Sequence, residues 1–281
     1  WRNFLPAAAG AGGMQINLLI DLILASLLQV GAISWLYYAD RVAQLPLGIV
    51  GIALGTALLP RLSAAEAGSR PAEVPDSLAE AVGLAGFLVI PAVAGLVLCG
   101  LSIMQGLFVY GAFDESDAQM AALALTAYGC GLPGFVMVKI LQTAFYAAGQ
   151  PGIVLKVSLT TVAINVAGSL LLMPILGHVG LALATAISGT AAATIMVVLL
   201  ARQNRLSVAF LPRLGKIIVA TAVMGAAVIS LQYGLDHFMH LPAAFDLMII
   251  VGGGGAVYAL MCYSIGAVPA GLMRRGEARN T

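Results

Sequence analysis

Charge is scarce in this chain of 281 residues: only 9% are Asp, Glu, Lys or Arg, whereas 61% are hydrophobic. A water-soluble domain keeps roughly a quarter of its residues charged, so this composition excludes an ordinary soluble fold. The net charge of +1 excludes a strongly basic surface, and we expect no nucleic-acid partner. With a mean hydropathy of +1.01, most of the surface is predicted to face lipid.

Cysteine and catalytic motifs are also rare. The cysteines Cys99, Cys130 and Cys262 lie inside apolar segments without CxxC spacing, which predicts small buried side chains rather than a disulfide or metal site. The sequence has no HExxH, GxSxG or phosphate-binding loop motif. His237 and His240, in a predicted loop, are interpreted as solvated. We therefore expect no enzyme, no resident metal and no cofactor.

Long apolar runs take the place of these features. Compared with the roughly 20 residues needed to cross a bilayer, they predict an all-α polytopic membrane protein with eight transmembrane helices. Prolines within spans, such as Pro91 and Pro133, are tolerated in lipid because side chains of neighbouring helices can bond the freed carbonyls. The predicted spans are 5–30, 33–59, 81–110, 118–147, 152–175, 179–201, 214–235 and 244–268.

The basic and acidic residues between the spans are distributed unequally over the two sides of the membrane. Every basic residue that lies outside a span or close to the end of one falls on one side of the membrane, whereas Asp114, Glu115, Asp117 and Asp236 fall on the other. The positive-inside rule therefore places both ends of the chain in the cytoplasm. The basic residues concerned are Arg2, Arg61, Arg70, Lys156, Arg202, Arg205, Arg213, Lys216, Arg274, Arg275 and Arg279. Because the chain begins with Trp1, we expect it to be a piece of a longer protein.

The charged residues that lie well inside the spans, away from their ends, are Asp21, Asp40, Arg41 and Lys139. A charge at membrane depth costs roughly 2.5–3.5 kcal/mol, so these side chains are expected to face protein or a wet cavity. Arg41 is the strongest candidate for binding substrate, because a guanidinium group binds phosphate through two hydrogen bonds. Lys139 is a second candidate. Alternatively, Asp40 only neutralises Arg41, and Lys139 is a structural ion-pair partner.

Uncharged polar residues follow the same helical stripes. Ser34 and Tyr38 lie close to the stripe of Arg41 and are candidate substrate contacts. A second set, Asp21, Asn165, Ser169 and Thr185, carries carboxylate, amide and hydroxyl oxygens, which hard cations prefer as ligands. These residues could hold a coupling cation if their helices converge. The alternative is that such amides and hydroxyls form hydrogen bonds between helices.

Several stretches resemble the MurJ/MviN-type lipid II flippases. They include residues 15–21 (QINLLID), 34–41 (SWLYYADR), 45–48 (LPLG), 59–63 (LPRLS) and 139–147 (KILQTAFYA). The resemblance covers roughly residues 4–200 and implies the multidrug/oligosaccharidyl-lipid/polysaccharide exporter fold. In that fold two six-helix lobes surround a central cavity, and this family adds two C-terminal helices.

The resemblance implies that the chain holds helices seven to fourteen and lacks the first lobe. Residues 1–201 would form the second six-helix lobe. Residues 202–281 would form two further transmembrane helices and a short basic cytoplasmic tail. The implied function is to flip the peptidoglycan precursor lipid II across the bacterial cytoplasmic membrane by alternating access.

The same resemblance implies roles for individual residues. Arg41 matches a cavity arginine that contacts the pyrophosphate of the lipid-linked sugar. Asp21, Asn165 and Thr185 resemble a cation site, with Na⁺ or H⁺ as the candidate coupling ion. Ser169 stands where some relatives carry a second Asp. The last two helices resemble those that form a groove for the polyprenyl tail.

Other functions remain open at this point. The chain could export a different lipid-linked oligosaccharide, or exchange drugs for cations, as other members of the superfamily do. It could also be a non-transporting membrane scaffold for wall synthesis. The expected partners are lipid II or a related polyprenyl-diphosphate-linked substrate, membrane lipids and, as further candidates, cell-wall synthesis proteins.

Overall fold

The computed structural model describes residues 17–67, 74–238 and 242–268. These residues form helices, short connections and an isolated β-bridge between Tyr110 and Phe113, which confirms the all-α prediction. A short helix, Asn17–Ser26, comes first. The others are α2 (Ala32–Ala67), α3 (Val74–Leu98), α4 (Gly100–Phe108), α5 (Glu115–Ala147), α6 (Pro151–Leu176), α7 (His178–Arg202), α8 (Leu211–Phe238) and α9 (Ala243–Ser264).

Among the described residues, 6 helices are long and apolar enough to cross a membrane: α3 and α5 to α9. The protein is therefore a multi-pass membrane protein. The predicted span 5–30 lies partly outside the described residues, which show its second half as the helix Asn17–Ser26. The predicted span 33–59 corresponds to the 36-residue α2. The count of eight spans stays a prediction.

The predicted span 81–110 differs most from the structure. It is divided between α3 and α4, because the helix stops at Leu98 and begins again at Gly100. Cys99 between them has ψ of 9°, outside the α-helical range. Such a break lies within an apolar run, and hydropathy alone does not reveal it.

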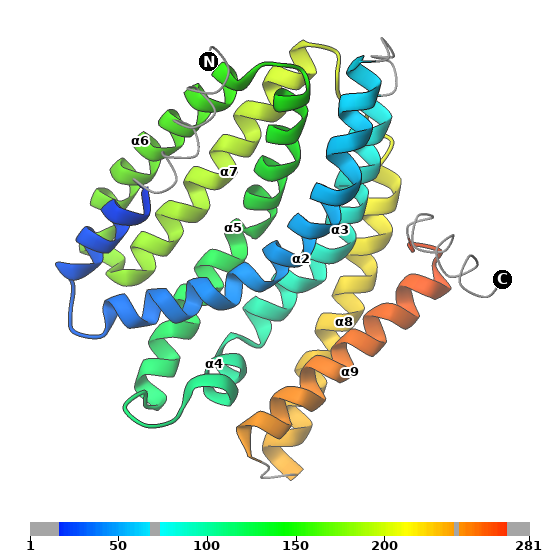
Figure 1. Cartoon of the computed structure of the whole chain (residues 1–281). Coiled ribbons are helices and arrows are strands. Elements are labelled where there is room, and N and C mark those ends of the chain that lie inside the picture. The colour runs from blue at the N-terminus through cyan, green and yellow to red at the C-terminus, as the bar shows by residue number, and fades with distance from the viewer. Residues whose placement is uncertain (1–16, 68–73, 239–241, 269–281) are drawn as a thin grey trace.

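Successive long helices run in opposite directions, with α5 in the middle of the bundle (Figure 1). α5 packs against α2, α3, α4, α6 and α7, whereas α9 packs against α8 and α4. The start of α6, the end of α7 and the start of α8 consequently lie at one end of the bundle. Gln203 there donates to Gln150 across a distance of 3.2 Å. The basic residues Lys156, Arg202, Arg205, Arg213 and Lys216 belong to this end.

Buried apolar residues form two separate clusters. The larger one joins residues of the short helix and α2 to α7, with Phe145, Met104 and Leu125 among its buried side chains. The second cluster joins α8 and α9 to α3, around Ile217, Met224 and Tyr258. Cys99 and Cys262 are buried in the second cluster as predicted, whereas Cys130 is exposed, so the prediction for Cys130 was wrong.

Small residues bring α5 and α7 into close contact. A Cβ atom added to Gly131 would lie 2.6 Å from Cα of Ala186, and one added to Gly134 would lie 2.8 Å from Cα of Thr190. Interfaces between membrane helices favour small residues for this reason, since backbones can approach only where side chains are short.

Gly131→Ala should therefore destabilise the bundle by about 1–3 kcal/mol, because the added methyl group overlaps backbone atoms that cannot rotate away. Thermal unfolding in detergent would measure this as a lower midpoint. Gly95→Ala is the matched control, because a Cβ atom at Gly95 in α3 would meet nothing within 4 Å. Equal midpoints for the two variants would show that α5 and α7 do not approach as closely as described.

Candidate functional site

Asp21 lies where three helices meet. Its Oδ2 accepts a hydrogen bond from Nδ2 of Asn17, one turn earlier in the short helix, at 3.2 Å. The hydroxyl of Thr185 on α7 lies 3.4 Å from the same oxygen. Nδ2 of Asn165 on α6 in turn lies 3.0 Å from the Thr185 hydroxyl. The helices that carry the predicted cation ligands Asp21, Asn165 and Thr185 therefore do converge.

The amide of Asn165 is satisfied better when its oxygen and nitrogen are exchanged. Its nitrogen then donates to Oδ1 of Asn17 at 3.1 Å and to Oδ1 of Asp21 at 3.0 Å, and its oxygen accepts from the Thr185 hydroxyl at 3.0 Å. Amide orientation is assigned from the hydrogen-bond network, so this orientation is the one to use. In it, the side-chain nitrogens of Asn17 and Asn165 both donate to the Asp21 carboxylate, each to a different oxygen.

Ser169 lies one turn after Asn165 on α6 and is fully buried. Its hydroxyl has no hydrogen-bond partner among the described residues. A buried hydroxyl without a partner costs free energy, so its retention calls for an explanation. Ser169 places this hydroxyl on the same helix as Asn165, where the resemblance puts a carboxylate in some relatives.

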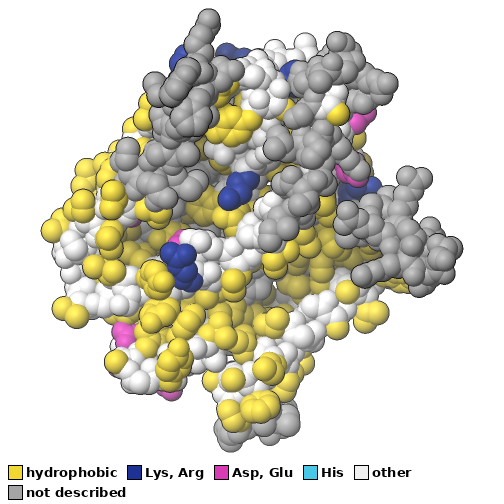
Figure 2. All heavy atoms as spheres, viewed as in Figure 1, with side chains coloured by type: hydrophobic (Ala, Val, Ile, Leu, Met, Phe, Trp, Pro, Cys, Tyr) yellow, Lys and Arg dark blue, Asp and Glu magenta, His cyan; other side chains and the backbone are white. Residues whose placement is uncertain are grey.

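Arg41 and Lys139 are both exposed on the bundle, on α2 and α5. The Arg41 guanidinium lies over the ring of Tyr37, with its Cζ atom 4.9 Å from the ring centroid. Among the described residues neither side chain has an ion-pair partner, and the contact that Arg41 makes is the one with the Tyr37 ring. Figure 2 shows basic side chains in the middle of the face that it draws, among hydrophobic and other side chains.

The neighbours of Arg41 on α2 have different environments. Ser34 is exposed, whereas the ring of Tyr38 packs against Phe108 and Phe113, with centroids 4.7 and 5.1 Å away. Asp40 accepts a hydrogen bond from the Gln44 side chain. In the structure, Tyr37 rather than Tyr38 contacts Arg41. The spacing of four between Tyr37 and Arg41 was a signal for this contact.

A polar cluster that the sequence did not indicate lies at the opposite end of the bundle from the basic residues. Nε1 of Trp35 donates to Oδ1 of Asp117 at 2.7 Å, and the Trp35 ring meets the ring of His178 edge-on at 4.9 Å. The second Asp117 oxygen completes a capping box with Asp114 at the start of α5. The Asp117 backbone N–H donates to Asp114, which lowers the pKa of the Asp114 carboxyl. Together these contacts tie α2, α5 and α7 at this end.

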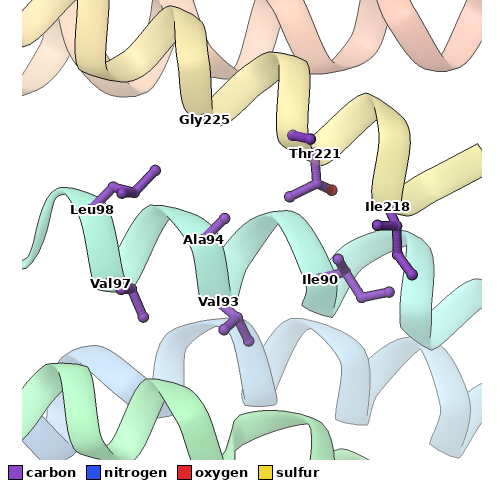
Figure 3. A pocket seen from close by; sticks show the side chains of 9 residues that line it. Ile90, Val93, Ala94, Val97, Leu98, Ile218, Thr221 and Gly225 are labelled. Atoms are coloured by element: carbon purple, nitrogen blue, oxygen red, sulfur yellow. The ribbon is translucent and has the colours of Figure 1, made fainter.

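An apolar groove of about 460 Å³ opens between α3 and α8. Figure 3 shows Ile90, Ala94 and Leu98 of α3 facing Ile218 and Thr221 of α8. The Thr221 hydroxyl is buried and has no partner among the described residues. The size and lining of the groove suit a hydrocarbon chain better than a polar ligand.

No group of three or more His, Cys, Asp or Glu that could hold a metal ion occurs among the residues described. His237 is exposed and stacks on Tyr233, whereas His240 lies outside the described residues.

Comparison with known proteins decides the family. Residues 1–250 match the family described as "Lipid II flippase MurJ". The chain belongs to this family. A probable lipid II flippase MurJ of Rhizobium tropici is 34% identical over 284 residues, which cover 98% of this chain and 53% of the relative. A corresponding protein of Rhizobium meliloti is 33% identical, over 98% of this chain and 52% of the relative.

Solved structures agree on the fold. The structure titled "Lipid II flippase MurJ, inward closed conformation" aligns over 90% of this chain and 51% of its own, with a TM-score of 0.76 and 22% identity. An outward-facing MATE family transporter aligns with a TM-score of 0.54 and 15% identity, over 92% of this chain and 62% of its own. The chain thus spans about half the length of the MurJ relatives that it matches.

Proposed function

We propose that this chain forms the second half of a transporter that flips lipid II across the cytoplasmic membrane by alternating access. No bond is made or broken in this process. The proposal is supported by family membership and, above all, by Arg41, an exposed arginine within the helical bundle that forms no ion pair with a described residue. A charge in that position is costly in lipid unless it serves a ligand or a wet cavity.

The proposed topology has eight spans, with both ends of the chain in the cytoplasm. The basic residues gathered at one end of the bundle support this orientation. Residues 1–201 form the second six-helix lobe, and residues 202–281 add two helices and a basic tail. The separate apolar cluster around α8 and α9 supports this division, although α3 contributes to both clusters.

In the proposed substrate path, the guanidinium of Arg41 binds the diphosphate of the substrate through charge-assisted hydrogen bonds. Lys139 on α5 adds a second positive charge. Ser34 is exposed on the same helix as Arg41, and Tyr38 is a further candidate contact on that helix. The polyprenyl tail lies in the apolar groove between α3 and α8, where van der Waals contacts hold it and no polar group of the substrate has to enter.

In the proposed coupling site, Asp21 binds a proton or Na⁺ together with Asn165 and Thr185. A carboxylate, an amide oxygen and a hydroxyl oxygen are a fitting donor set for a hard cation. To complete it, the Asn165 amide turns its oxygen from Thr185 toward the bound ion. Asn17 and Ser169 are further candidate ligands, because Asn17 bonds Asp21 directly and the Ser169 hydroxyl lacks a partner among the described residues. Binding here would favour one orientation of the lobes over the other.

Complementation tests the proposed function. The first half of the Rhizobium tropici relative would be joined to this chain, and the chimera expressed in cells depleted of their own lipid II flippase. We expect growth to be rescued. An inserted chimera that leaves the cells unable to grow would contradict the lipid II assignment, and parallel rescue assays in mutants that lack other exporters would then test another lipid-linked oligosaccharide.

A further inference from the structure

Two backbone carbonyl groups of α3 lack the N–H donor that a regular helix would supply. Pro91 lies inside the helix and has no N–H, so the carbonyl of Phe87, four residues earlier, lacks its intrahelical donor. The helix then ends at Leu98. The Gly95 carbonyl still accepts from the N–H of Cys99, but the Leu98 carbonyl is among those that a helix end leaves without a backbone donor. In a membrane interior without water, each of these carbonyls needs a donor from a neighbouring element.

The two donors come from the two C-terminal helices. The hydroxyl of Tyr258 on α9 donates to the carbonyl of Phe87 at 2.6 Å. The side-chain amide of Gln232 on α8 donates to the carbonyl of Leu98 at 3.2 Å. Both helices therefore bond to those backbone carbonyls of α3 that lack a donor within the helix.

Side-chain packing supports both contacts. Tyr258 is buried, and its ring centroid lies 5.5 Å from that of Phe87. A Cβ atom added to Gly225 of α8 would lie 3.3 Å from the Leu98 side chain, so α8 runs close to α3 near the second break. These contacts belong to the apolar cluster around α8 and α9, which also includes Phe87 and Leu98.

The apolar groove lies between the two bonded carbonyls along α3. The α3 residues that line the groove run from Ile90 to Leu98 (Figure 3). They begin one turn after Phe87 and end at Leu98. The groove has α3 on one side and α8 on the other. The Gln232 bond joins these two walls directly, whereas the Tyr258 bond joins α3 to α9, which packs against α8.

We propose that Tyr258 and Gln232 are positioning residues that bind α9 and α8 to the two breaks of α3. They hold α3, α8 and α9 as one unit and thereby set the width of the groove. In this proposal, the C-terminal helices α8 and α9 hold α3 of the lobe in position. This inference rests on backbone hydrogen bonding and holds whatever the transported substrate is.

A double-mutant cycle on the chimera in lipid nanodiscs tests the proposal, with amide hydrogen exchange of α3 as the readout. Tyr258→Phe removes the hydroxyl and keeps the ring, so we expect exchange in α3 around Pro91 to become about tenfold faster. In a Pro91→Ala background the new N–H can bond the Phe87 carbonyl itself. There Tyr258→Phe should change exchange by less than about twofold.

The control for Tyr258→Phe is Tyr263→Phe, which removes a hydroxyl from the same helix at a residue that is 81% exposed. Exchange in α3 should stay unchanged in this variant. If Tyr258→Phe accelerates exchange equally with and without the Pro91→Ala substitution, or has no effect in either background, the assignment of the hydroxyl to the Phe87 carbonyl is wrong.

Gln232→Leu provides a second test that does not depend on the folding of the Pro91→Ala variant. Leucine has a similar size and no donor, so we expect faster exchange confined to the α3–α4 junction. Unchanged exchange at that junction, or equal acceleration in α5 and α7, would contradict the proposed tie. Neither measurement requires transport, so failure of the lipid II assignment would leave this result unaffected.

Discussion

Arg41→Ala should reduce transport by the chimera by about ten- to a hundredfold, because the diphosphate loses a charge-assisted, two-point contact worth roughly 1.5–3 kcal/mol. Arg41→Lys should recover only part of this loss, since an ammonium group keeps the charge without the paired geometry. Growth rescue after depletion of the native flippase gives the first readout, and the rate of substrate transfer in vesicles gives the second.

The control for this effect is Arg202→Ala, which removes an exposed arginine at the last turn of α7. It lies at the basic end of the bundle, away from the proposed path, and should retain rescue. Arg41 forms no ion pair with a described residue, so its removal should leave the fold intact. Full rescue by a well-inserted Arg41→Ala chimera would exclude Arg41 from the substrate path.

Asp21→Asn should reduce transport about as much as Arg41→Ala does, but for a different reason. The amide keeps the shape of the side chain and can still bond to Thr185, but the negative charge that attracts the coupling ion is lost. We expect transport to fall about ten- to a hundredfold and to lose its dependence on the Na⁺ or proton gradient. Transport measured in vesicles with imposed ion gradients separates these two effects.

Asp40→Asn is the matched control for Asp21, because it also neutralises a carboxylate within the helical bundle. Asp40 bonds to Gln44 on its own helix, outside the Asp21 cluster. Its variant should keep the ion dependence of transport. Unchanged rate and unchanged ion dependence in Asp21→Asn would show that the cluster is a structural set of hydrogen bonds between helices.

The sequence predicted the all-α, multi-pass membrane architecture, because hydropathy acts over whole spans. Bonds between polar residues four apart in one helix, from Asn17 to Asp21 and from Gln44 to Asp40, follow from the sequence as well. Spacing of four residues determines such contacts within a helix. The convergence of Asp21 with Asn165 and Thr185 needed the family resemblance, since no local rule relates residues so far apart in sequence.

Contacts between helices were harder to predict. Trp35 bonds Asp117, and Tyr258 bonds the Phe87 carbonyl, across large separations in sequence. The division of the third span at Cys99 was missed because both halves are equally apolar. Cys130 was expected to be buried, but in a membrane protein an apolar segment can present a small side chain to lipid at little cost.

The most direct test of the account is flipping of fluorescent lipid II by the purified chimera in sealed vesicles, followed with a quencher that cannot cross the membrane. The account predicts that lipid II from the inner leaflet becomes accessible to the quencher with the chimera, and much more slowly with its Arg41→Ala form. Accessibility equal to that of protein-free vesicles, with a folded and inserted chimera, would contradict the claim that this chain is half of a lipid II flippase.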